Sequence, residues 1–172
     1  MLSPAAVATV TTMDTELRVA PPGDWEDFRA VRLRALADSP TAFGATLDDA
    51  RAQPDAAWRD RLQVPGPTLL AYVAGSPAGM GGLFVPEDED HAFVWGMWVA
   101  PEARGRGLGR AILRELLQHA EQLDRTVLLH VTEGNDGARR LYEAHGFVAT
   151  GEWEPLREGS SLQIELLRLD RG

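Results

Sequence analysis

A glycine- and arginine-rich segment constrains this chain most strongly, because of what lies on either side of it. Residues 104–109 read R-G-R-G-L-G and follow the apolar run 91–99, which Pro101 ends. Beyond them, apolar residues recur at about one helical turn and predict a long amphipathic helix: Leu108, Ile112, Leu116, Ala120 and Leu123. The nearly continuous apolar run 127–131 is typical of a strand covered on both faces. Strand, glycine loop, helix and strand in this order predict a parallel β-α-β crossover.

The rest of the chain predicts antiparallel strands and further helices around that crossover. Two apolar runs, 68–74 and 78–85, are separated by Gly-Ser-Pro and indicate a β-hairpin, to which run 91–99 adds a third strand. The other expected elements are a strand at 16–20, a helix that Asp24 could cap, a helix opened by Pro54, a helix at 136–145 after Asn135, and a closing hairpin of 147–153 and 161–169. The predicted fold class is α/β: a single domain with a mixed, mostly antiparallel central sheet, one parallel crossover, and helices on both faces.

Two amphipathic patterns predict which side chains are buried. The first helix places an apolar stripe at helical spacing, Trp25, Phe28, Val31, Ala35 and Leu36, and leaves Arg29, Arg32 and Arg34 more exposed. In the last strand Leu162, Ile164 and Leu166 alternate with Gln163 and Glu165. Residues 1–15 are expected to form a disordered tail, and residues 16–170 to form the domain.

Composition excludes several classes of function. The chain has no cysteine, which rules out disulfides, thiolate metal sites and acyl-cysteine intermediates. Its formal net charge of -9 argues against nucleic acid as the main partner, because phosphate binding needs a basic surface. No apolar run approaches the roughly 20 residues that span a bilayer. We therefore expect a cytoplasmic protein with no membrane partner and a cationic small substrate.

The glycine loop has the properties of a phosphate-binding turn. Glycines let the backbone approach a ligand closely, and a helix that begins there offers unpaired N–H groups. The dinucleotide fingerprint G-x-G-x-x-G fails because Arg110 occupies the third glycine position, and no G-K-[ST] motif is present. The two commonest nucleotide-binding motifs are thus disfavoured.

Two spaced motifs together resemble a known family. Val99-x-Pro101-x-x-Arg104-x-x-Gly107-x-Gly109 is followed, after the crossover, by Asn135-x-x-Ala138-x-x-Leu141-Tyr142-x-x-x-Gly146-Phe147. This pattern resembles the GNAT superfamily of N-acetyltransferases over about residues 16 to 169. The resemblance implies a GNAT acetyltransferase domain that uses acetyl-CoA as co-substrate and no metal.

The resemblance also implies a set of donor-binding residues. Backbone amides of residues 104–109 would hold the coenzyme A pyrophosphate, with the arginines as countercharge. The pantetheine arm would lie along Met97 and Val99, where the two parallel strands separate, with the Val99 N–H near the acetyl carbonyl as an oxyanion donor. Asn135 would cap its helix, contact the pantetheine region, or both. The full implied set is Met97, Val99, Arg104, Gly105, Arg106, Gly107, Leu108, Gly109, Arg110 and Asn135.

For catalysis, the resemblance points to Tyr142 as the proton donor to the departing thiolate, with simple packing as the alternative. The amine can attack the thioester directly, but it must first lose a proton. Many relatives carry a glutamate on the strand before the loop, and the aligned position here is Phe93. His91 lies on the same strand face, although residues 87–91 read more simply as a solvated acidic turn. His130 is a lone strand histidine, to which the sequence assigns no role.

The expected reaction is acetyl transfer to a primary amine on a small molecule. The same resemblance implies that the acceptor side is built from residues 32–58 and the closing hairpin loop near residues 153–160, with Phe43 either a pocket wall or an anchor for its loop. Two alternatives stay open: an acetyltransferase for protein N-termini or lysines, and a non-catalytic acyl-CoA sensor. A homodimer is a further expectation from the resemblance.

Overall fold

The computed structural model describes residues 14–172. Its strands are β1 (Thr15–Val19), β2 (Thr68–Val73), β3 (Ser76–Phe84), β4 (His91–Val99), β5 (Thr126–Thr132), β6 (Phe147–Pro155) and β7 (Gln163–Leu169). Its α-helices are α1 (Trp25–Asp38), α2 (Leu47–Arg51), α3 (Asp55–Arg61), α4 (Leu108–Glu121) and α5 (Asp136–Ala144). The predicted tail lies almost wholly outside the described residues, so its disorder stays a prediction.

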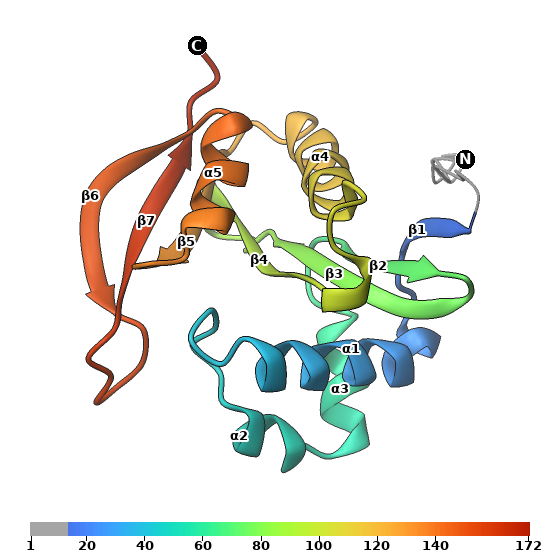
Figure 1. Cartoon of the computed structure of the whole chain (residues 1–172). Helices are drawn as coiled ribbons and strands as arrows, with labels where there is room; N and C mark the ends of the chain where they lie inside the picture. The colour runs from blue at the N-terminus through green and yellow to red at the C-terminus, as the bar shows by residue number, and fades with distance from the viewer. Residues whose placement is uncertain (1–13) are drawn as a thin grey trace.

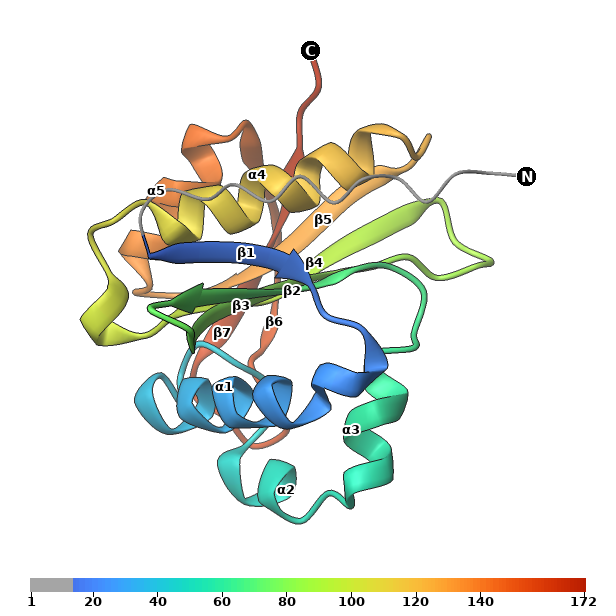
Figure 2. The ribbon, with the colours of Figure 1, turned by 90° about the vertical axis from the view of Figure 1, so that its right-hand side faces the viewer.

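The seven strands form one mixed sheet in the order β1-β2-β3-β4-β5-β7-β6. Only β4 and β5 are parallel, and α4 connects them. Helices α4 and α5 cover one face of the sheet, and α1 to α3 lie on the other (Figures 1 and 2). The predicted α/β architecture with helices on both faces is confirmed. No helix within residues 14–172 has both the length and the apolar character needed to cross a membrane.

Strands β4 and β5 separate partway along their length. They pair at only three positions, and the last pair is Phe93 with Leu128. Gly96 in β4 has a φ of 66°, and the β3 register shifts opposite it, as in a β-bulge. The C-terminal half of β4 is therefore left without a β5 partner, beside the glycine loop that follows it.

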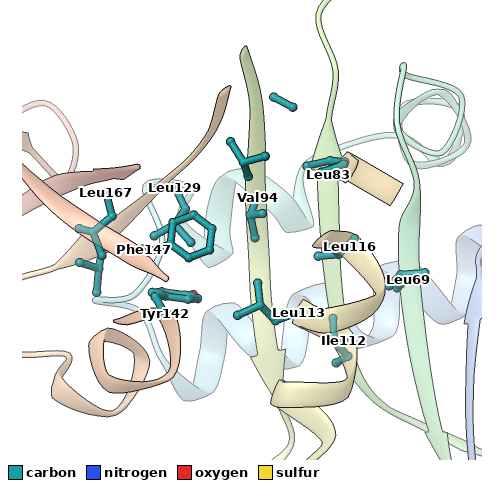
Figure 3. Packing of buried hydrophobic residues seen from close by; sticks show 14 of the residues in the cluster. Leu69, Leu83, Val94, Ile112, Leu113, Leu116, Leu129, Tyr142, Phe147 and Leu167 are labelled. Carbon is teal, nitrogen blue, oxygen red and sulfur yellow. The ribbon is translucent and has the colours of Figure 1, made fainter. Parts of the chain in front are cut away.

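Apolar packing fixes α4 against the sheet. Ile112, Leu113 and Leu116 are fully buried and contact residues of the central strands (Figure 3). The same cluster includes Tyr142 of α5, whose ring lies edge-on to Phe147 at 6.0 Å. A second cluster on the opposite face holds α1 through Phe28, which contacts Trp58 of α3. These two cores set the positions of the loop and of α5.

The structure corrects some sequence-based predictions. Asp24 occupies the N-cap of α1 but makes no capping hydrogen bond, because its carboxylate pairs with Arg18 at 3.0 Å. Glu165 is buried rather than exposed, since α5 supplies Arg139 at 2.6 Å as its partner.

Arg32 is also buried, at 9% exposure, and not on the exposed side of α1. Its guanidinium carbon stacks 4.7 Å from the centre of the Phe43 ring. Burial, and secondarily the charge of Arg61, lowers the pKa of Arg32 to about 10. The Arg32 side chain is long enough to reach Phe43 on the loop after α1. The spacing of residues within the helix gives no sign of this aromatic partner.

Candidate active site

The glycine loop leaves its backbone bare on one side. Gly105 and Gly107 both have a φ of 78°, in the left-handed region that other residues adopt only at a cost. No heavy atom lies within 4 Å of a Cβ built at either position. A ligand can therefore approach the backbone of this turn closely.

The loop also offers a row of hydrogen-bond donors. Within the described residues, the backbone N–H groups of residues 105 to 110 have no backbone acceptor, and the first bond of the helix runs from the Ala111 N–H to the Gly107 carbonyl at 2.9 Å. The donors lie at the N-terminus of α4, a 14-residue helix whose dipole adds positive potential there. Six free amides at a helix start form a site for an anion such as a phosphate.

A cleft with a cavity volume of about 680 Å³ lies against this loop. That volume is within the range of small-molecule and cofactor sites. Of the ten predicted donor-binding residues, all except Arg106 line the cleft, as does Tyr142; the lining includes Met97, Val99, Arg104, Gly105, Gly107, Leu108, Gly109, Arg110 and Asn135. The two motifs, separated in sequence by a helix and a strand, therefore meet at one cavity.

Arg104 is held in place by the protein itself. Its Nε donates to the Val99 carbonyl at 3.0 Å, and its Nη2 donates to Oδ2 of Asp38 at 2.7 Å. The indole N–H of Trp98 donates to the same carboxylate oxygen at 2.9 Å. The arginine thus ties the loop to the end of α1, and part of its charge is already balanced.

Asn135 and Tyr142 come from the two ends of α5. Asn135 caps the helix, because its side chain accepts a hydrogen bond from the Ala138 N–H at 3.4 Å. The Tyr142 ring is buried, and burial raises the pKa of its hydroxyl to about 12. In the described part of the chain this hydroxyl makes no hydrogen bond to protein, although the residue lines the cleft. Tyr142 therefore stays protonated at neutral pH and faces the cavity.

A smaller inner pocket of about 70 Å³ continues from the cleft. The two cavities share Ala42, Phe43, Met97, Asn135, Ala138 and Tyr142. The inner pocket is further lined by Gly96 of the β4 bulge and by His130 of β5. Its size suits a group of a few atoms, since a water in the liquid takes about 30 Å³.

An outer cavity of about 390 Å³ lies beside the region where β4 and β5 part. It is lined by His91, Phe93, Leu128, His130, Glu152, Trp153, Glu154 and Leu166. Two carboxylates, two imidazoles and two aromatic rings gather there, a combination that suits a cation. Among residues 14–172 no group of three histidine, aspartate or glutamate side chains is arranged to hold a metal ion.

Two loops beside these cavities are joined by Arg157 of the β6–β7 loop. Its guanidinium donates to the carbonyls of Pro40, Phe43 and Gly44 at 2.8 to 3.2 Å. The anchored α1–α2 loop carries Phe43, which is 8% exposed and lines both the cleft and the inner pocket. Phe43 is therefore an anchor and a pocket wall at once.

Comparison with known proteins agrees with this geometry. The model of the acetyltransferase (GNAT) family matches residues 29–147. The chain belongs to the GNAT family. A mycothiol acetyltransferase from Thermobispora bispora is 37% identical over 139 residues, 76% of this chain and 45% of that protein. This GNAT chain thus spans about half the length of the curated relatives it matches.

Solved structures show the same fold. A GNAT-family acetyltransferase from Streptococcus pneumoniae aligns with a TM-score of 0.73 and 22% identity, over 90% of this chain and 98% of that one. The protein yncA from Salmonella typhimurium, solved with its cofactor acetyl-CoA, aligns with a TM-score of 0.71 and 19% identity, over 92% and 94%. At these identities the likeness concerns the GNAT fold alone.

Sequence reasoning missed the contribution of β5 and β6 to the cavities. The sequence assigns no role to His130 and gives no sign that Glu152 and Glu154 lie at a cavity. The sequence does contain a signal for His130. A parallel crossover places β5 next to β4, and two-residue alternation puts His130 on the other face of the strand from the apolar Leu129 and Val131. The position of β6 could not be foreseen, since β7 inserts between β5 and β6.

Proposed function

We propose that this chain transfers the acetyl group of acetyl-CoA directly to a primary amine on a small molecule. The observation that carries the proposal is the continuity of the site. Six free backbone amides for a phosphate open onto a 680 Å³ cleft, which continues into an inner pocket beside a protonated tyrosine. Membership of an acetyltransferase family supports the same chemistry.

The donor would bind along the cleft. The amides of residues 105 to 110 would hold the pyrophosphate, with Arg106 and Arg110 adding positive charge. The free edge of β4 at Met97 and Val99 would pair with the pantetheine arm, as a further strand would. The Val99 N–H would then stabilise negative charge on the acetyl oxygen during transfer.

Tyr142 would serve as the general acid. Its hydroxyl is protonated at neutral pH, as a phenol with the ordinary pKa near 10 is, and burial raises this pKa further, to about 12. A thiolate, the conjugate base of a thiol with a pKa near 8.5, is stabilised on leaving by a donor held close to it. No covalent enzyme intermediate is needed, in keeping with a chain that has no cysteine.

The acceptor would enter through the outer cavity. Glu152 and Glu154 would attract an ammonium group, and the rings of Phe93 and Trp153 would contact the rest of the molecule. A cavity of about 390 Å³ is large enough for a small amine. The relative named for mycothiol, itself a small molecule, supports the same substrate class. A cytoplasmic location and a homodimer stay predictions.

Thiol release in the presence of an amine panel tests the proposal. The panel should contain polyamines, amino acids, amino sugars and aminoglycosides, together with peptides that offer a free N-terminus or a lysine. Release with a small amine, and mass spectrometry of an acetylated product, is the expected result. Faster release with peptides would favour a protein acetyltransferase. Binding of acetyl-CoA without release on any amine would indicate a sensor and contradict the proposal.

A further inference from the structure

His130 occupies the point where the acceptor side and the donor side of the site meet. Of the residues that the structure describes, it alone lines both the inner pocket and the outer cavity. Among the residues that line the inner pocket, the titratable side chains are those of His130 and Tyr142. Since Tyr142 is protonated at neutral pH, His130 is the group there that can take up a proton.

The position follows from how β4 and β5 diverge. Phe93 and Leu128 form the last pair between these strands, and His130 lies two residues beyond Leu128. Its neighbours Leu129 and Val131 are buried on the α4 face, so alternation directs His130 to the other face, together with Phe93. The His130 imidazole therefore lies on the same face of the sheet as the Phe93 ring, two residues beyond the last pair between β4 and β5.

Glu154 of β6 lies next to the imidazole. Its Oε1 lies 3.3 Å from Nε2 of His130, and the side chains are 61% and 36% exposed. A carboxylate this close favours a proton on Nε2, which leaves Nδ1 as the nitrogen that can accept one. Two other histidines also face a glutamate, His91 with Glu89 and His119 with Glu115, but neither lines the inner pocket.

We propose that His130 is the general base of the transfer, positioned by Glu154. This role rests on the proposed function. His130 takes the proton from the acceptor ammonium, and the freed nitrogen lone pair forms a bond to the acetyl carbon. The carbon–sulfur bond breaks, its electron pair leaves on sulfur, and Tyr142 donates a proton to that sulfur. The new amide nitrogen gives its remaining excess proton to solvent water, solvent returns a proton to the Tyr142 phenolate, and His130 releases its proton to water through the outer cavity.

Other charged groups surround the imidazole. Glu152 and Glu154 face it from β6, His91 from β4 and Tyr142 from α5. On β7 its direct partner is the apolar Leu166, and Arg168 lies opposite Leu128. Because His91 is a second imidazole that lines the outer cavity, the test must separate the two histidines.

The test measures kcat against pH for the wild type and for His130→Gln with an amine identified from the panel. We expect kcat to fall about 100-fold at neutral pH, the usual contribution of a positioned base, and the acidic limb of the profile to disappear. The affinity for acetyl-CoA should stay within about twofold of wild type, which excludes misfolding. His91→Gln should keep the acidic limb, and Glu154→Gln should lower kcat without changing the KM for acetyl-CoA.

His119→Gln is the matched control, because it removes a histidine that faces a glutamate on α4, and it should behave as wild type. Retention of the full rate and of the acidic limb in His130→Gln would overturn the assignment and leave the proposed function standing. Failure of the wild type to acetylate any amine, despite binding acetyl-CoA, would overturn both.

Discussion

Nη2 of Arg104, in the glycine loop, lies 2.7 Å from Oδ2 of Asp38, at the end of α1. Hydrogen bonds from Trp98 and Ser39, and then from Arg104, hold the pKa of Asp38 below its usual value against the opposing effect of burial. The contact joins residues 66 positions apart in sequence. It couples the C-terminal end of α1 to the turn that would bind the donor.

The Asp38 carboxylate should contribute a pH-dependent part of the stability. Because its pKa is lower in the folded state, the contribution is complete above the unfolded pKa and is lost as pH falls through the folded pKa. Asp38→Asn should therefore destabilise the protein by roughly 0.5 to 1 kcal/mol at pH 7, a value reduced for solvent screening. Urea unfolding should show a smaller difference at pH 3. Asp60→Asn, at an exposed position of α3 with no ion pair in the described chain, should have little effect at either pH.

Gly107→Ala tests the phosphate loop. The left-handed backbone at φ 78° should cost roughly 1 to 2 kcal/mol with alanine, and open space at the Cβ allows the variant to fold. A changed backbone conformation would turn the loop amides away from the phosphate, which should weaken acetyl-CoA binding by at least about tenfold, as measured by calorimetry. Gly75→Ala is the control, since Gly75 has the same φ and the same open space in the β2–β3 turn. Equal losses of affinity in both variants would argue against a specific role of the loop.

Tyr142→Phe tests the general acid. The variant should bind acetyl-CoA as wild type does, while kcat falls about 100-fold or more. The other tyrosine, Tyr72, donates to Asp27 at 2.8 Å and accepts from Arg18 at 3.0 Å, remote from the cleft. Tyr72→Phe should lower the free energy of unfolding by about 1 kcal/mol and leave kcat unchanged. An unchanged kcat in Tyr142→Phe would mean that the phenol only packs.

Arg157→Ala tests the link between the two loops on the acceptor side. Loss of three hydrogen bonds to the carbonyls of the α1–α2 loop should loosen Phe43 and raise the KM for the amine several-fold. Acetyl-CoA affinity should change little. Steady-state kinetics with either substrate varied separates these effects. Arg51→Ala, on the exposed end of α2, should leave both constants unaltered.

The sequence predicted the residues that line the large cleft better than those that line the outer cavity. Local patterns are sufficient to place these residues. The two glycines, Gly105 and Gly107, matter through their own backbone conformation, and Asn135 caps a helix through the N–H three residues later. The crossover brought Tyr142 to the same cleft, because a helix after a parallel strand must return over the sheet.

The acceptor side depends on contacts between distant segments. His130 of β5 meets Glu154 of β6 across the intervening strand β7, and the buried Arg32 lies against the ring of Phe43 on the loop after α1. Neither contact leaves a periodic signal. The short helix α2, capped by Thr46, is too brief for its pattern to stand out.

Calorimetric titration of the purified protein with acetyl-CoA tests the central claim most directly, because it requires no knowledge of the acceptor. The site described above predicts saturable binding of one acetyl-CoA per chain, competed by coenzyme A and weakened in Gly107→Ala but not in Gly75→Ala. Absence of binding to the folded wild-type protein would contradict the claim that the cleft holds the acetyl donor.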